Sequence, residues 1–116
     1  MKATKFGLFI RQSRLLKGVN LKQMAESMEM KPSFLSALEL GKKAISEETI
    51  IKVISYLGLD ATKEQELREA ADRSQPIAKV NLTTESARDR ELVLMFARKF
   101  REIPEDEKQR LEDLLL

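Results

Sequence analysis

The chain has 116 residues, a formal net charge of +2, and neither cysteine nor histidine. Those two absences exclude disulfides, thiolate nucleophiles, histidine general bases and zinc sites built on Cys or His. The four glycines are scattered and form no phosphate-binding loop, so we expect a protein that is not an enzyme and carries no cofactor or metal.

Hydrophobic residues make up 42% of the chain and charged residues 34%, which is typical of a globular protein with a well-charged surface. No apolar run approaches the ~20 residues that span a bilayer. The first residues place charge on both sides of a short apolar patch without a cleavage site after it, which argues against a signal peptide. We therefore expect a cytoplasmic protein with no membrane association.

The charge is distributed unevenly along the chain. Residues 1–43 contain nine Lys and Arg against three Asp and Glu, a net charge of +6. Residues 44–116 contain twelve against sixteen, a net charge of −4. A basic first part and an acidic second part indicate a polyanionic partner for the first part only. The alternative is an uneven distribution of charge over solvated faces.

The first predicted helix spans residues 5–17. Phe6 and Ile10 recur on one helical stripe, and Leu16 extends that stripe. Gly18 ends the helix, because glycine tolerates the positive φ of a helix C-terminus.

Residues 21–41 are predicted to form two short helices joined by a tight turn. Asn20 and Gln23 have the spacing of a capping box for the first helix. Pro32 suits the first turn of the second helix, which ends at Gly41. Two helices in this arrangement are typical of a helix-turn-helix, whose second helix enters the major groove of DNA.

Two further helices follow. Ser46 caps the first of them, which ends at Gly58. Thr62 and Gln65 have the spacing of another capping box, which predicts a helix over residues 62–73.

Residues 74–86 show a different pattern, with Pro76 near the start and alternating apolar and polar residues after it. The alternation predicts a linker with a short strand at 77–82, and a lone strand would need its copy in a second subunit as a partner. An extended linker without pairing fits the sequence equally well. Both alternatives remain open at this point.

Residues 87–116 are predicted to form a helical hairpin that Pro104 divides in two. Its apolar face is too wide to be hidden within one short appendage, so the hairpin either docks on the first domain or forms a dimer interface. We favour the interface, built from Leu92, Met95, Phe96, Phe100, Leu111 and Leu114. The sequence thus predicts an all-α fold, with a five-helix DNA-binding domain at residues 1–73 and a linker before the hairpin.

Several short matches to a known pattern fall in register between Phe6 and Leu59: Ile10-Arg11 and Arg14 before Gly18, Met24-Ala25, Leu38-Glu39-Leu40-Gly41-Lys42, Val53, and Leu57-Gly58-Leu59. At this spacing, about half of the chain resembles the phage repressor and Cro-type helix-turn-helix family, often called the XRE family. The resemblance implies a five-helix domain that binds a palindromic operator in double-stranded DNA as a homodimer.

The resemblance also implies roles for individual residues. Those that face phosphate would be Asn20, Leu21, Lys22, Lys42 and Lys43. Those that face base edges would be Lys31, Ser33, Phe34, Ser36 and Ala37, which we call the base-facing row. For Phe34, packing in the core is an equally open alternative. Arg14 and Glu39 match a pair that forms a structural salt bridge in this family.

The sequence departs from the family pattern at three points. Leu21 stands where many members carry a Gln that reaches phosphate. Glu29 occupies a turn position usually held by a small residue, and a left-handed conformation there costs about 1 kcal/mol. The base-facing row contains no Arg, Asn or Gln for bidentate base contacts. We therefore expect base recognition by apolar contact and DNA shape, with a strong salt dependence from phosphate contacts.

The leading hypothesis is a dimeric transcriptional repressor. The alternative is an antitoxin that binds a toxin through its acidic C-terminal half and autoregulates its operon. A toxic reading frame next to the gene would favour the antitoxin, whereas a hairpin buried fully in a homodimer would weaken that hypothesis.

Overall fold

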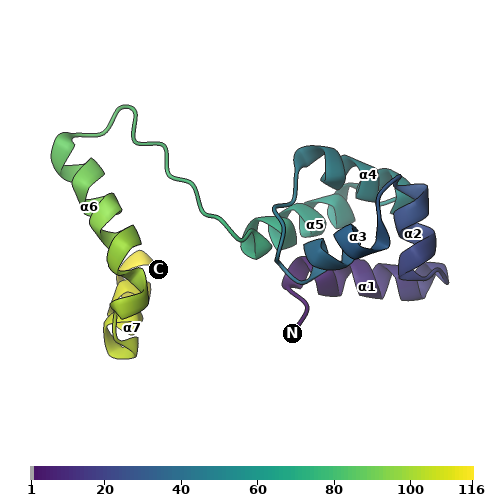
Figure 1. The fold of residues 1–116 in the computed structure, drawn as a ribbon, viewed down its shortest axis with the longest axis horizontal. Helices are drawn as coiled ribbons and strands as arrows, with labels where there is room; N and C mark the ends of the chain where they lie inside the picture. The colour runs from purple at the N-terminus through teal and green to yellow at the C-terminus, as the bar shows by residue number, and fades with distance from the viewer. Residues whose placement is uncertain (1) are drawn as a thin grey trace. The chain divides into compact units, whose positions relative to one another are not determined.

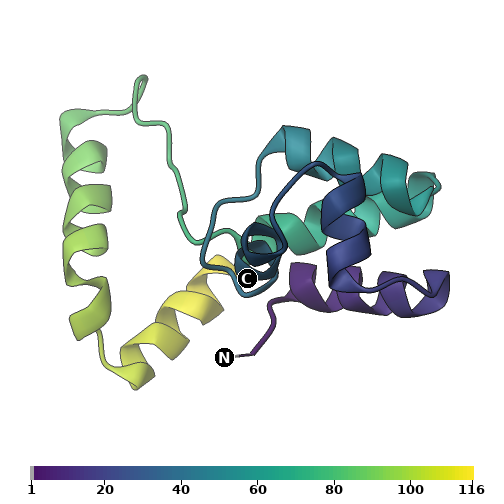
Figure 2. The same cartoon turned by 45° about the vertical axis from the view of Figure 1, so that its right-hand side comes forward.

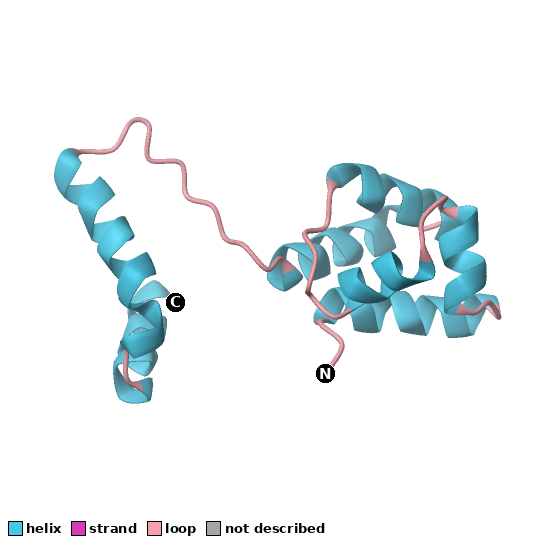
Figure 3. Cartoon of the chain, viewed as in Figure 1, coloured by secondary structure: helices cyan, strands magenta, loops and turns pink. Residues whose placement is uncertain are grey.

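The computed structural model describes residues 2–116, which form seven α-helices and one short 3-10 helix (Figures 1 and 3). The chain divides into two compact units, of which the first ends at Ala78 and the second spans Lys79–Leu116. The described residues include no strand, so the predicted all-α fold class is confirmed. None of the described helices is long and apolar enough to cross a membrane.

The first unit contains helices α1 (Lys5–Lys17), α2 (Leu21–Ser27), α3 (Pro32–Glu39), α4 (Glu47–Leu57) and α5 (Ala61–Ser74). Figure 1 shows α3 in front, with α4 above it and α1 below. Helix α1 contacts α3, α4 and α5, while α2 packs mainly against α3.

The core of the first unit draws side chains from each of these helices. The most deeply buried apolar side chains are Phe6, Ile10, Met24, Ala25, Leu35, Leu38, Val53, Leu67 and Ala71. Burial of one large apolar side chain contributes about 1.5–3 kcal/mol, so this cluster is the main source of stability.

Leu16 does not extend the buried stripe of α1 as predicted, since it is 91% exposed. Arg14 is buried in its place. Leu16 lies two positions after Arg14, which turns the leucine about 200° around the helix axis from the buried arginine, away from the core.

Side-chain caps mark the starts of α1, α2, α4 and α5. The predicted capping box of α2 is present, with Asn20 Oδ1 accepting from the Gln23 N–H at 2.8 Å and Gln23 Oε1 accepting from the Asn20 N–H at 2.9 Å. The predicted cap of α5 is wrong. Asp60 caps this helix by accepting from the Lys63 N–H at 2.8 Å, so the helix starts before Thr62. A carboxylate at this position also suits the positive end of the helix dipole.

Residues 75–86 have no regular secondary structure in the single chain, and the strand predicted at 77–82 does not form there. The reason is that a strand needs a partner for its backbone groups. Ile77 and Val80 are each 63% exposed. Pairing with a second copy stays a prediction.

The second unit contains α6 (Ala87–Lys99), the 3-10 helix η1 (Phe100–Glu102) and α7 (Glu105–Leu115). The hairpin is open, because α6 and α7 diverge from η1 instead of packing along each other (Figure 2). No residue in Lys79–Leu116 is buried. This unit therefore lacks a hydrophobic core of its own.

Candidate nucleic-acid interface

The turn between α2 and α3 fixes the direction of α3. Glu29 adopts a left-handed conformation with φ of 56°. The next residue, Met30, donates its N–H to the carbonyl of Ala25 at 3.0 Å, which closes the turn. Pro32 then occupies the first turn of α3, where its missing N–H leaves no hydrogen bond unmade.

Helix α3 has a buried inner side and an open outer side. Leu35 and Leu38 are fully buried against the core. On the outer side, Lys31 and Ser33 are exposed, Ser36 and Ala37 are half-buried, and Phe34 is 39% exposed. The base-facing row therefore lies together along one accessible side of α3, and Phe34 is not a core residue.

The predicted phosphate-facing residues lie at the start of α2 and in the loop after α3. Lys22 is exposed, while Asn20 uses its side-chain oxygen to cap α2. Leu21 is half-buried and packs against the core, so its main contact is with the domain itself. Lys42 and Lys43 are both exposed in the loop that joins α3 to α4.

Arg14 and Glu39 form a buried ion pair between α1 and α3. Arg14 Nη1 lies 2.6 Å from Glu39 Oε2, and Arg14 Nη2 lies 3.1 Å from Glu39 Oε1. Glu39 is 1% exposed, so its carboxylate is removed from solvent and faces no DNA surface. Arg11 adds a second cation, with Nε 3.1 Å from Glu39 Oε1. This bidentate geometry fixes the end of α3 on α1.

Thr4 and Gly7 also contribute to the contact between the end of α3 and the start of α1. The sequence pattern did not single out either residue. The N–H and the hydroxyl of Thr4 both donate to the carbonyl of Glu39, each at 3.0 Å. A Cβ atom at Gly7 would overlap the backbone of Glu39, so only glycine permits this close approach. A glycine inside an otherwise well-patterned helix was the available signal.

The predicted dimer residues lie in the second unit, apart in sequence from the base-facing row. Leu92, Met95, Phe96 and Leu111 line a common groove of about 550 Å³, together with Ile103 and Pro104. Phe100 does not line the groove, but its ring packs edge-to-face with that of Phe96, with 5.7 Å between the ring centroids. Leu114 is 80% exposed and does not line the groove.

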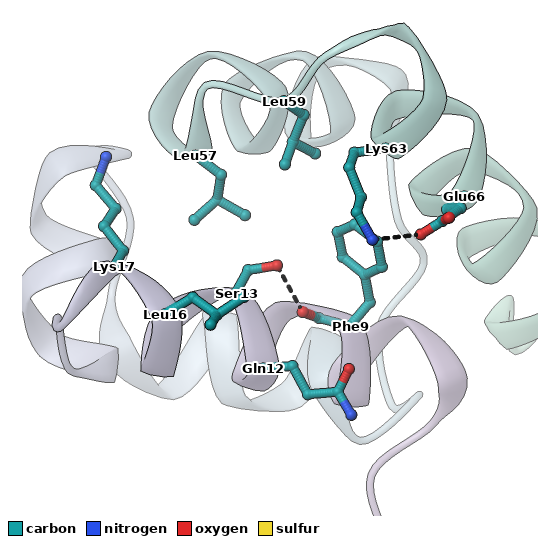
Figure 4. A pocket seen from close by; sticks show the side chains of 9 residues that line it. All are labelled: Phe9, Gln12, Ser13, Leu16, Lys17, Leu57, Leu59, Lys63 and Glu66. Atoms are coloured by element: carbon teal, nitrogen blue, oxygen red, sulfur yellow. Dashed lines mark hydrogen bonds and ion pairs between the residues drawn. The ribbon is translucent and has the colours of Figure 1, made fainter.

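A separate cleft of about 430 Å³ opens between α1, the end of α4 and the start of α5 (Figure 4). Most of its polar side chains form hydrogen bonds within the domain. Ser13 Oγ donates to the carbonyl of Phe9 at 2.8 Å, and Lys63 Nζ donates to the Glu66 carboxylate at 3.1 Å. Leu57 adds apolar lining. The cleft therefore offers apolar contact and not a nucleophile paired with a base.

Comparison with known families agrees with this geometry. Residues 10–63 match the family described as Helix-turn-helix. The match starts in α1, ends in α5, and includes both short helices and the turn between them. The chain carries an XRE-type helix-turn-helix domain. No curated protein and no solved structure matched the chain.

The helix-turn-helix domain makes the protein a DNA-binding transcriptional regulator. The buried Arg14–Glu39 pair fixes α3, the second helix of the helix-turn-helix, on α1.

Proposed function

We propose that this helix-turn-helix regulator is a dimeric repressor that occupies operator DNA with α3 in the major groove. The observation that carries the proposal is the accessible outer side of α3, which lies between exposed lysines. Lys31 precedes the helix, and Lys42 and Lys43 follow it. A recognition helix with cations at both ends can contact the phosphates on either side of a groove.

The chemistry of the base-facing row favours a particular mode of recognition. Phe34 and Ala37 offer apolar contact to thymine methyl groups, and Ser33 and Ser36 each offer one hydroxyl. Lys31 is the single long donor in the row. Sequence preference would then come from methyl contacts and DNA shape, while phosphate contacts supply most of the affinity.

Dimerisation would occur through the α6–α7 groove. Its lining is mostly apolar and exposed, and the second unit has no buried residue with which to stabilise itself. The charges of the two helices are complementary, since Ala87–Lys99 has a net charge of +2 and Glu105–Leu115 a net charge of −3. An arrangement in which α6 packs against α7 of a second copy would bury the apolar faces and bring opposite charges together.

A direct test is selection of bound duplexes from a random DNA pool, followed by affinity measurements at several salt concentrations. Replacement of Lys42 and Lys43 by Ala should weaken binding to every duplex. It should also reduce the slope of log K against log salt by roughly 0.9 for each phosphate that the variant no longer neutralises.

Replacement of Lys5 and Lys63 by Ala provides a control of equal charge within the first unit, because both lysines line clefts on the α1–α5 side of the domain. That control should leave the salt slope unchanged. Phe34→Ala should instead alter the preferred sequence. If the Lys42/Lys43 variant and Phe34→Ala both keep the affinity, salt slope and sequence preference of the parent, the assigned surface is wrong.

Toxin neutralisation is a second candidate function, and the acidic charge of α7 favours it. A basic active site on another protein would be complementary to the net charge of −3 on this helix. The two functions predict different states of the isolated protein. A repressor should be a stable dimer through the groove, whereas an antitoxin of this kind should keep the groove open until its partner binds.

A further inference from the structure

The side chain of Gln75, the first residue after α5, makes two hydrogen bonds to one distant residue. Gln75 Oε1 accepts from the N–H of Ile45 at 2.9 Å, and Gln75 Nε2 donates to the carbonyl of Ile45 at 2.8 Å. One amide side chain thus satisfies both backbone polar groups of Ile45. The Ile45 side chain is 5% exposed, so this point of the α3–α4 loop is anchored in the core as well.

Ile45 closes the loop that carries the two exposed lysines. At the start of the loop, the N–H of Lys42 donates to the carbonyl of Ala37 at 2.9 Å. Lys43 follows, and Ile45 lies two residues after it. The loop is therefore bonded to α3 at Lys42 and to Gln75 at Ile45, and Lys43 lies between these two bonded residues.

The position of Gln75 is itself well determined. Its neighbour Ser74 is buried, accepts from the N–H of Phe6 at 3.0 Å through Oγ, and donates to the carbonyl of Ala70 at 2.6 Å. These bonds tie the end of α5 to the start of α1. The backbone from which the Gln75 side chain reaches the loop is therefore held in place by the end of α5.

We propose that Gln75 is a positioning residue for DNA binding, which holds the α3–α4 loop so that Lys42 and Lys43 face phosphate. This inference rests on the proposed phosphate role of the two lysines. A loop already held in its bound conformation loses less entropy when DNA binds, so its contacts yield more affinity. The amide suits the role because it supplies one donor and one acceptor without adding negative charge near phosphate.

The test uses Gln75→Met in the full chain, which keeps the length of the side chain and removes both hydrogen bonds. Binding to a selected duplex should weaken by roughly tenfold, because the freed loop and its lysines must be ordered when DNA binds. Gln65→Met is the matched control, since Gln65 is exposed on α5 and bonds only to Glu69 one turn away. The control should bind like the parent.

A double-mutant cycle distinguishes positioning from a general loss of structure. In a chain that already carries Lys42→Ala and Lys43→Ala, Gln75→Met should cost no further affinity. An equal loss in both backgrounds would overturn the proposal. If the lysine changes weaken binding and Gln75→Met does not, only the positioning role is wrong. If the lysine changes have no effect, the proposed phosphate contacts are wrong and the role of Gln75 falls with them.

Hydrogen exchange on the unaltered protein gives an independent test that needs no variant. The amide of Ile45 should exchange much more slowly than that of the exposed Lys43, because Gln75 accepts its hydrogen bond. Equal, fast exchange at both amides would overturn the proposal.

Discussion

Glu29 is the residue at which the helix-turn-helix changes direction, and it does so in the left-handed region with φ of 56°. A side chain with a Cβ atom is strained in that region by about 1 kcal/mol, whereas glycine is not. The Glu29 side chain is exposed, so little packing compensates for the strain. The turn is therefore less stable than the same turn with glycine at position 29.

Glu29→Gly should stabilise the first unit by about 1 kcal/mol, because the backbone strain is removed. The thermal midpoint should rise by roughly 4–8 °C for a domain of this size. Glu29→Ala is the matched control, since it removes the carboxylate but keeps the Cβ atom, and its midpoint should stay near that of the parent. An equal rise for both variants would show that the charge of Glu29, and not its backbone, is unfavourable.

At the scale of elements, the position of α3 depends on its crossing with α1. The buried carboxylate of Glu39 lies at this crossing and receives two cations of different exposure. The Arg14 side chain is 10% exposed and that of Arg11 is 46% exposed. We therefore expect the two arginines to contribute differently to the free energy of unfolding, although both contact the same carboxylate.

Arg14→Ala should destabilise the domain by about 3 kcal/mol or more, because it leaves a buried carboxylate without its bidentate partner. Arg11→Ala should cost about 1 kcal/mol or less, as for other solvent-exposed ion pairs. Chemical denaturation of the two variants at neutral pH measures both values. Similar losses for the two variants would contradict the assignment of Arg14 as the structural partner.

Local patterns in the sequence were sufficient to predict the helices of the first unit. The capping box at Asn20 and the glycines at 18 and 58, which end α1 and α4 in left-handed conformations, are signals contained within a few residues. At α5 the sequence offers two candidate capping residues two positions apart, and Asp60 caps the helix in place of Thr62. Interactions within one helical turn were thus predictable to within a residue or two.

Contacts between distant residues could not be predicted in the same way. The bonds of Gln75 to Ile45 join residues 30 positions apart, and the approach of Gly7 to Glu39 depends on the packing of two helices. No local pattern encodes either contact. For the candidate site, the sequence indicated which residues of α3 would be accessible, but not what holds the helix and its loop in place.

At the scale of the whole molecule, the two units differ in how they are stabilised. The first has a buried core, whereas the second exposes its apolar residues on α6 and α7. Phe96 and Leu94 lie two residues apart on α6 and are similarly exposed, at 46% and 48%. Only Phe96 lines the groove, so the pair offers a matched comparison of groove and outer face.

Phe96→Asp should convert the proposed dimer of the 116-residue chain to a monomer, because it places a charge inside the proposed interface. Leu94→Asp should leave the dimer intact. Sedimentation velocity at micromolar protein measures both outcomes, and the thermal unfolding of the first unit checks that the helix-turn-helix domain of each variant is intact. A parent chain that sediments as a monomer, or two variants that dissociate equally, would contradict a dimer through this groove.

The missing core of the second unit has a consequence for how the protein responds to its own abundance. Helices of 13 and 11 residues are marginal in water when isolated, since such helices need roughly 12–15 residues even in favourable sequences. If association stabilises α6 and α7, each tenfold dilution of the protein lowers that stabilisation by about 1.4 kcal/mol. Helix content in this unit would then follow mass action, and operator occupancy would fall steeply once synthesis of the chain slows.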